Sequence, residues 1–471
     1  MKIPLIGGHN RRRSVNHDGQ RTVNLYVETD SAEPETGSAL YMVPGKTEFC
    51  AIGDGPIRAM IRFFDYVIAV SNNEVYVIQS SGASTMVGTI AIDASGRVAM
   101  SANRNHVVIV CGSMAYTCTA TTLTEITDPD FVGSYNVEYL DGYFIFSIPD
   151  SQQFYISAIN DGSSLDSLDF AQAESNLDDI VRPFVDHQEL WLFGEYSTEI
   201  WYNSGASDFP FARRDGAVLE VGCAAPESVA SADNTIFWLG RNKHGSGIVY
   251  RADQYNPQII SNRGIEYEIS LIDDITDARA FTYQQAGHTF YVLAFPSGGK
   301  TFVYDASVQD PDAAWHVRET YLQGRDRSNC YAFAWGMHLV GDYASSVIWI
   351  LDDDTYTDGG LPILWERTMP RIMSDAKRVF FRSLTVNIER GVGLTSGEGS
   401  NPKMYLDWSD DGGHTWCSKR EASMGAMGNY KPVVTFNRLG SSRDRVFRLT
   451  GSEPVKTVIL GGYLTAEAGE N

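Results

Sequence analysis

Short apolar segments that come in pairs, each pair joined by a polar turn, recur along the first 360 residues of the chain. The first pair is Val67–Val70 with Val75–Ile78, and the seventh is His338–Val340 with Val347–Ile350. Successive pairs lie about 45 residues apart, which is the length of one four-stranded blade of a β-propeller. One such sheet cannot bury both of its faces alone, whereas blades around an axis cover one another. The sequence therefore predicts an all-β chain with a β-propeller of about seven blades.

The pattern changes after Pro362. Shorter alternating strands follow, such as Phe380–Ile388 and Arg445–Thr450, and these indicate a compact C-terminal β-sandwich. At the other end the first 38 residues are mostly polar, and we expect them to form an extended arm. The expected division of the chain is an N-terminal arm over 1–38, a β-propeller over 39–360 and a β-sandwich with a short tail over 361–471.

Two further expectations concern the propeller. The strand-like segment Leu40–Val43 precedes the first blade, and the last blade lacks an outer strand, so pairing between the two would close the ring. The segment Leu165–Ile180 is rich in Asp and Ser, and we expect a long loop there.

The charge balance of the chain excludes a broad phosphate-gripping surface. There are 37 lysine and arginine residues against 59 aspartate and glutamate residues, a formal net charge of −22. Such a charge favours solubility and repels other polyanions. No apolar run approaches the roughly 18 residues of a membrane span, so we expect no membrane insertion. Arg11–Arg13 follow the apolar Ile3–Ile6 instead of preceding it, which is not the order of a signal peptide.

One local motif closely matches a known turn pattern. Ser409, Asp411, Gly413, Thr415 and Trp416 fit the Ser-x-Asp-x-Gly-x-Thr-Trp pattern of the Asp-box, a turn of sialidase-like propellers. The Asp411 carboxylate can accept hydrogen bonds from backbone N–H groups, Gly413 permits a positive φ, and Trp416 can pack beneath the turn. The motif occurs once, in the region of the expected sandwich. We therefore predict a structural turn with no catalytic role.

The rest of the sequence predicts no catalytic, cofactor or metal site. It contains no nucleophile elbow, phosphate-binding loop or metal spacing of histidines. Asp352–Asp354 with Asp358, and Asp273–Asp274 with Asp277, are oxygen-rich, but neither set has the arrangement of an EF-hand. Solvated loops are the expected outcome for both.

Arg11, Arg12 and Arg13 form a basic cluster in the expected arm of an acidic chain. Two interpretations remain open for this cluster. It is either an ordinary solvated arm or an anchor into the acidic surface of a partner or neighbouring subunit. These three arginines are the candidate partner-contact residues.

Segments spread in order over nearly the whole chain resemble the tail-hub proteins of short-tailed bacteriophages. These proteins are also called packaged-DNA stabilisation proteins or tail nozzles. The resemblance is carried by Thr22–Val27, Val43–Gly45, Gly55–Arg58, Ser197–Gly205, Trp408–Gly413 and Arg443–Phe447.

The resemblance implies a structural virion protein, made in the host cytoplasm, that forms a homo-hexameric ring below the head–tail adaptor protein. It implies a nozzle that closes the portal–adaptor channel, retains packaged DNA and conducts it at ejection. Double-stranded DNA would pass through without sequence-specific binding. Contacts with a tail fibre or tailspike and with a tail needle or plug are also implied, and catalytic residues and cofactors are not. Two alternatives stay open: a propeller that binds carbohydrate or cleaves glycosides as a sialidase does, and a cellular propeller scaffold.

Overall fold

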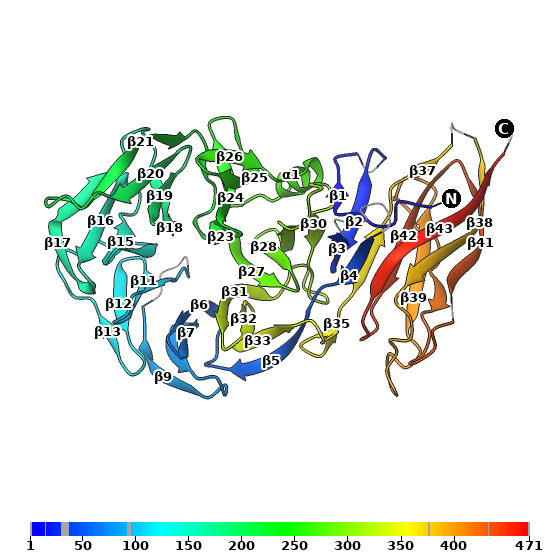
Figure 1. The fold of residues 1–471 in the computed structure, drawn as a ribbon, viewed down its shortest axis with the longest axis horizontal. Coiled ribbons are helices and arrows are strands. Elements are labelled where there is room, and N and C mark those ends of the chain that lie inside the picture. Colours follow the sequence, from blue (N-terminus) through cyan, green and yellow to red (C-terminus); the bar gives the residue numbers. More distant parts are fainter. Residues whose placement is uncertain are drawn as a thin grey trace.

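The structure is a computed structural model of the chain and describes residues 2–14, 16–29, 37–91, 96–374, 377–431 and 433–469. Strands dominate it, and the helical elements of the described residues are the short helix α1 (Arg263–Ile269) and the 3-10 turn η1 (Pro226–Ser228). Within this part of the chain no helix is long and apolar enough to cross a membrane. Figure 1 shows a ring of small sheets beside a layered pair of sheets, which bears out the predicted propeller and sandwich.

Seven small antiparallel sheets form the blades of the propeller. The first four are β6 (Ile57–Phe63), β7 (Tyr66–Ser71), β8 (Glu74–Ile78) and β9 (Ser84–Thr89); β10 (Ala99–Ala102), β11 (Val107–Cys111), β12 (Met114–Cys118) and β13 (Leu123–Glu125); β14 (Val137–Leu140), β15 (Tyr143–Ser147), β16 (Gln153–Ala158) and β17 (Asp161–Gln172); and β18 (Ile180–Asp186), β19 (Glu189–Gly194), β20 (Thr198–Asn203) and β21 (Phe211–Leu219).

The last three blades follow the same order with two exceptions: in blade five both β22 and β23 pair with β24, and in blade seven the outer strand comes from the N-terminus. They are β22 (Gly222–Cys223), β23 (Ala230–Ala232), β24 (Thr235–Asn242), β25 (Gly245–Asp253) and β26 (Asn256–Ile259); β27 (Arg279–Gln285), β28 (His288–Phe295), β29 (Lys300–Asp305) and β30 (Trp315–Val317); and β31 (Ser328–Ala334), β32 (Met337–Asp342) and β33 (Val347–Asp352) with the N-terminal β5 (Gly45–Ala51).

Blade packing explains why the hairpins appear in the sequence as unbroken apolar runs. Successive side chains of a strand face opposite sides, and in a propeller both sides are covered by neighbouring blades. In β24, Trp238 meets Phe193 of blade four at 5.4 Å between ring centroids, and Phe237 stacks on Tyr291 of blade six at 5.3 Å. Two adjacent residues of β24 thus pack against the blades on either side of it.

The ring is closed by an N-terminal strand, but not by the one we expected. β5 pairs with β33 along its whole length, from Gly45 opposite Asp352 to Ala51 opposite Val347. Leu40–Val43 does not join the last blade. It belongs to β4 (Ser38–Met42), which pairs with the C-terminal strand β43 (Val458–Ala468) through Leu40 opposite Ile459. Both strands are apolar enough to pair with the last blade or with the sandwich. The tertiary path of the chain, and not its local composition, therefore decides which strand closes the propeller.

A second expectation was wrong in blade three. Residues 165–172 were expected in a long loop, but they form the second half of β17, the outer strand of that blade. An outermost strand has one edge and much of its surface in water, so Asp and Ser are tolerated there.

The C-terminal sandwich consists of two layers of five strands each, the second of which continues into the sheet of blade six. One contains β3 (Leu25–Thr29), β4, β43, β38 (Val379–Ile388) and β41 (Val434–Ser442), and the other contains β2 (Gly19–Val23), β36 (Trp365–Thr368), β42 (Asp444–Gly451), β39 (Lys403–Ser409) and β40 (Arg420–Ser423). Their facing sides share one apolar core, in which Phe381 and Phe447 meet edge to face at 5.5 Å. Three of the ten strands come from the N-terminus.

The N-terminal residues, expected as an arm, are therefore part of the folded body. β2 pairs in parallel with β30 of blade six, at Val23 opposite Val317, and antiparallel with β36 of the sandwich. This pairing makes one continuous sheet from the propeller into the sandwich, and Figure 1 shows β2, β3 and β4 between the two domains. The physical reason is that this short strand satisfies the open edges of both domains at once.

The closure strand supplies the first prediction. The Gly45 N–H donates to the Thr355 carbonyl oxygen at 2.9 Å, and an ideal Cβ at Gly45 would lie 2.2 Å from that oxygen. Gly45→Ala should therefore lower the free energy of unfolding by about 2 kcal/mol, because β5 must move off the ring. Gly245→Ala is the matched control, since a Cβ there meets no atom within 4 Å. Urea unfolding followed by tryptophan fluorescence measures both, and equal loss in the two variants would contradict this view of the closure.

Candidate functional site

The N-terminal residues up to β4 lie between the propeller and the sandwich, and we call this region the seam. At its centre Arg367 of β36 is completely buried. Its guanidinium donates to the carbonyl oxygens of Leu5 (2.7 Å) and Gly8 (3.0 Å), to the Thr22 hydroxyl (2.8 Å) and to the Gln20 side-chain oxygen (2.7 Å). Burial lowers the pKa of Arg367 to about 10, so it remains charged at neutral pH. All four acceptors belong to the N-terminal residues, which are thereby fixed to the sandwich.

The same N-terminal residues are fixed to the propeller through α1. The His9 ring lies 2.6 Å from a carboxylate oxygen of Glu268, and both side chains are buried. Lys300 of blade six pairs with the other oxygen of Glu268. Asn262, which caps α1, donates to the His9 carbonyl oxygen at 2.9 Å. Burial alone would raise the pKa of Glu268, but His9 and Lys300 outweigh it and hold this pKa at about 2.

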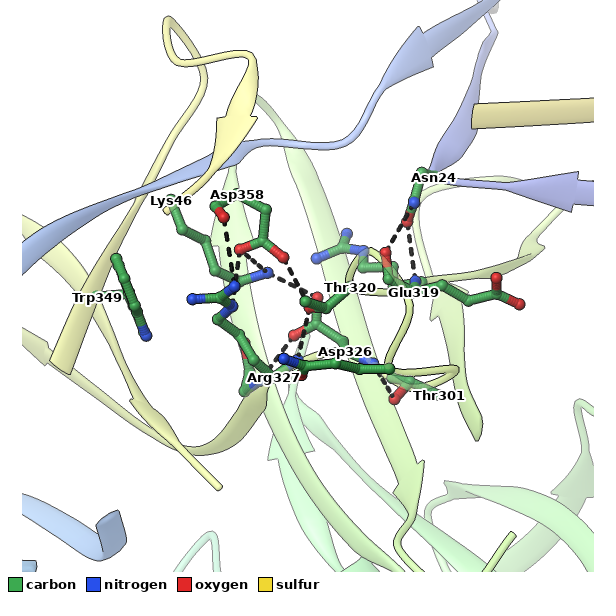
Figure 2. Close-up of polar contacts among 12 residues, drawn as sticks. Asn24, Lys46, Thr301, Glu319, Thr320, Asp326, Arg327, Trp349 and Asp358 are labelled. Atoms are coloured by element: carbon green, nitrogen blue, oxygen red, sulfur yellow. Dashed lines mark hydrogen bonds and ion pairs between the residues drawn. The ribbon is translucent and has the colours of Figure 1, made fainter. Parts of the chain in front are cut away.

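Asn24 sets the path of the chain between β2 and β3. It has a positive φ of 52°, which asparagine tolerates better than most residues. Its amide donates to the carbonyl oxygens of Glu319 (2.9 Å), after blade six, and Leu364 (2.8 Å), in the link to the sandwich, and its side-chain oxygen accepts the Glu319 N–H. One side chain thus joins three segments of the seam (Figure 2).

Figure 2 also shows a buried ionic cluster beside Asn24, at the base of the closing blade. Lys46 of β5 lies 2.7 Å from Asp326 and 3.5 Å from Asp358, and Arg327 lies 3.1 Å from Asp358. The Thr320 hydroxyl donates to Asp358 at 2.7 Å. Burial raises the pKa of Asp326, but the Lys46 ammonium overcomes this and lowers it well below its usual range. Each charge is matched inside the cluster, so the arrangement is structural and ties the closure strand to the seam.

Three carboxylates of the acidic loops that we considered for calcium accept hydrogen bonds or pair with a cation of the protein itself. Asp358 lies in the ionic cluster, and Asp352 accepts from the Asp354 N–H and the Thr355 hydroxyl. Asp277 accepts from Ser297. Across the described ranges no group of three or more His, Cys, Asp or Glu side chains is placed to hold a metal ion.

The candidate partner-contact arginines lie on a hairpin that rises from the seam. β1 (Asn10–Arg11) pairs with β2, and the Arg12 N–H donates to the Asp18 carbonyl oxygen at 3.0 Å. Arg11 and Arg13 are exposed and Arg12 is half-buried. The hairpin is thus anchored at its base by the Arg367 contacts and presents two arginine side chains to solvent.

The Asp-box turn closes on itself through Asp411. This carboxylate accepts the Ser409 hydroxyl (2.6 Å), the His414 N–H (3.0 Å) and both the N–H (2.8 Å) and the hydroxyl (2.6 Å) of Thr415. These hydrogen bonds to the charged form lower the pKa of Asp411 well below its usual range. Gly413 has a φ of 99°. Every oxygen of Asp411 is used within the turn, which is a structural arrangement.

The structure brings the two predicted sets of residues together. A hollow of about 140 Å³ is lined by Arg11 from the hairpin and by Gly413 and Trp416 from the Asp-box turn. Three more arginines line it, Arg21, Arg371 and Arg448, whereas Arg12 and Arg13 do not. Arg448 lies over the Trp416 ring at 3.8 Å and pairs with a carboxylate on its own sheet, and Arg371 donates to the backbone of the hairpin at 3.0 Å. This basic hollow, between hairpin and turn, is the candidate partner-contact site.

Arg367 generates the second prediction. Arg367→Met removes the donor to the carbonyl oxygens of Leu5 and Gly8 and to the Gln20 side chain, while the Thr22 hydroxyl keeps its bond to Gly7. The loss of these bonds should lower the free energy of unfolding by about 3 kcal/mol or more. Arg382→Met is the control, because Arg382 is 64% exposed and pairs with Glu467 at the sandwich surface. Calorimetry should show a large drop in melting temperature for the first variant only. Equal melting temperatures would mean that the seam does not depend on Arg367.

Glu268 generates a prediction about pH. Its folded pKa of about 2 lies below its ordinary value of 4.5, so its ionised form stabilises the fold fully above pH 4.5 and less as the pH falls towards 2. Glu268→Gln should cost about 3 kcal/mol at pH 7, and the gap to wild type should narrow below pH 4.5. The control is Glu421→Gln at the exposed pair with Lys403. A gap that stays constant from pH 7 to pH 3.5 would contradict the role of this carboxylate.

Several solved structures share a distant likeness with this chain. The N-terminal domain of Nup159 shares 9% identity at a TM-score of 0.42, over 69% of this chain and 98% of that one. The Pan2 WD40 domain of Neurospora crassa shares 7% at 0.42, over 66% and 96%, and the computationally designed Ika8 protein shares 11% at 0.38, over 65% and 99%. Scores below 0.5 support no conclusion about this chain. A search of curated proteins found no match.

Two family models match the sequence in the order of its domains. Residues 1–356 match "Bacteriophage P22 Gp10, beta-propeller", and residues 364–467 match "Bacteriophage P22 Gp10, beta-sandwich". The residues between the two matches are those that link blade seven to the sandwich. The match confirms the resemblance to tail-hub proteins of short-tailed phages: the chain belongs to the bacteriophage P22 Gp10 family of phage structural tail proteins.

Proposed function

We propose that this protein is the hub, or nozzle, of a short phage tail. In this role it closes the portal–adaptor channel, retains the packaged DNA and conducts it at ejection. The observation that carries the proposal is the family match over both domains. The protein is made in the host cytoplasm and resides in the virion tail, where it meets the head–tail adaptor, a tail fibre or tailspike, and a tail needle or plug.

A ring of copies supplies the lumen for DNA. A B-DNA duplex is about 20 Å across, and the centre of a single propeller is too narrow for it because inner strands and their side chains fill it. In this chain the inner strand β6 lies against both β10 and β31, as expected for a tight centre. The proposed assembly is a homo-hexamer that matches the adaptor above, with each propeller beside the DNA path.

The acidic charge supports a conduit that does not hold its cargo. A net charge of −22 per chain repels phosphate, and a basic lumen would slow DNA by binding it. Double-stranded DNA therefore passes without sequence-specific binding. The basic hairpin, by contrast, suits an acidic protein surface, and we assign Arg11–Arg13 to the contact with the adaptor.

The protein acts without catalysis in this proposal. The Asp-box carboxylate is consumed within its own turn, and the ionic cluster of the seam is matched internally. Turnover of a sialoside by the pure protein, abolished by one carboxylate substitution, would overturn this part of the proposal and favour the glycoside-cleaving alternative.

The adaptor contact can be tested by charge removal. Replacement of Arg11, Arg12 and Arg13 by alanine should weaken co-sedimentation with the adaptor, and more at 50 mM than at 300 mM salt, because salt screens exposed charge contacts. The control removes the same charge from exposed arginines of the propeller, Arg62, Arg104 and Arg213. The assignment fails if both triple variants lose equal affinity, or if neither does.

A further inference from the structure

A hollow of about 400 Å³ lies at one end of the propeller's central channel, far in sequence from the seam hairpin. Most of its lining residues lie at or just before the starts of the inner strands β6, β10, β27 and β31 or in η1, which precedes β23, and Pro296 and Tyr343 follow the ends of β28 and β32. Inner strands of successive blades run in the same direction, so their starts meet at one end of the channel. The volume falls within the range of small-molecule sites.

The lining carries more positive than negative charge, unlike the chain as a whole. Its cations are four arginines: Arg58, Arg97, Arg279 and Arg325. Its anions are three carboxylates: Glu227, Asp274 and Asp277. The hollow thus has one positive charge in excess within a protein of net charge −22.

Two of the four arginines are oriented by contacts with the protein, and the hollow keeps its excess positive charge. Arg279 pairs with Glu227 at 3.2 Å. Arg58 donates to the carbonyl oxygens of Asn72 (2.8 Å) and Gly96 (3.1 Å), which orient it but do not neutralise it. Burial, and after it the neighbouring Arg279, lowers the pKa of Arg58, as expected for a cation crowded by another.

Arg325 and Asp277 each have one buried polar atom that makes no hydrogen bond with the described residues. Arg325 is only 7% exposed and lies over the Tyr343 ring at 3.5 Å, and its buried Nη1 makes no hydrogen bond to any described residue. Asp277 accepts the Ser297 N–H and hydroxyl at 2.8 and 2.6 Å through Oδ2, while its buried Oδ1 accepts from none of the described residues. Buried polar atoms are normally satisfied, so an open donor and an open acceptor in one hollow point to a ligand.

We propose that this hollow binds a hydroxylated monocarboxylate, the chemistry of a sugar acid. The ligand carboxylate accepts from Arg325 Nη1 and lies among the guanidinium groups, and a ligand hydroxyl donates to Asp277 Oδ1. A single negative charge balances the excess of the site. A phosphate dianion suits it less, because three carboxylates line the same hollow.

The site is tested by calorimetric titration of the full chain with D-glucuronate as the probe. Saturable binding is expected for glucuronate, with at least about tenfold weaker binding of cyclohexanecarboxylate, which lacks hydroxyls, and of D-glucose, which lacks the charge. Inorganic phosphate should bind no better than these two. An oligosaccharide that ends in glucuronate forms a second arm: tighter binding than the monosaccharide assigns the site to a surface glycan, and weaker binding assigns it to a free sugar acid.

Single substitutions distinguish glucuronate binding in this hollow from a general effect of protein charge on affinity. Arg325→Met should abolish glucuronate binding, and Arg97→Met, at a less buried position, should weaken it about tenfold with the melting temperature kept. In Asp277→Asn the amide oxygen must serve Ser297, so a donor faces the hollow, and the preference for glucuronate over cyclohexanecarboxylate should disappear. Arg263→Met, at a residue 79% exposed on α1, is the control.

The proposal is overturned if glucuronate shows no saturable binding, if phosphate binds as tightly, or if a folded Arg97→Met or Asp277→Asn variant binds as wild type does. None of these results bears on the hexameric ring or the adaptor contact, so failure of this inference is distinguishable from failure of the proposed function.

Discussion

The buried guanidinium of Arg367 is the interaction on which the architecture most depends. A buried charge is costly unless hydrogen bonds replace its water, and here four oxygens from the N-terminal residues do so. Those residues must therefore return to the sandwich before it is complete. Since the next strands, β2 to β4, join both sandwich sheets and β5 closes the propeller, one N-terminal segment finishes both domains.

This arrangement makes the propeller and the sandwich one mechanical unit. The contacts of Asn24 and the continuous sheet from β30 through β2 to β36 cross the seam, and the ionic cluster around Lys46 lies beside it. The hub that we propose would transmit load between its neighbours, and an inter-domain hinge would absorb that load. The hairpin with Arg11–Arg13 rises from a base held by Arg367 and Arg371, which suits a docking element.

The sequence predicted what local patterning encodes. The seven hairpins were visible because their strands are buried on both faces and therefore read as apolar runs, as at Ile236–Leu239 in β24. The Asp-box turn was visible because its hydrogen bonds span only a few residues. The blades and the C-terminal sandwich could thus be predicted without knowledge of their neighbours.

The features that could not be predicted depend on contacts between residues that are far apart in the sequence. Arg367 reads as an ordinary strand residue, and its acceptor Leu5 lies 362 positions away. The choice of β5 over β4 as closure strand, and the meeting of Arg11 with the Asp-box turn, likewise follow from the tertiary path of the chain. For the four arginines of the propeller hollow no sequence signal exists. Arg58 and Arg279 lie at the starts of β6 and β27 and Arg97 and Arg325 lie before β10 and β31, so only the common direction of the inner strands brings them together.

The claim that this protein is a ring-forming tail hub is tested most directly by an electron cryomicroscopy map of the virion that contains it. The account predicts six copies around the tail axis below the adaptor, a central lumen lined mainly by acidic and neutral side chains, propeller channels off the axis, and the Arg11–Arg13 hairpin against a neighbouring protein. A map with this chain away from the portal–adaptor axis, or with a lumen lined by lysine and arginine, would contradict it.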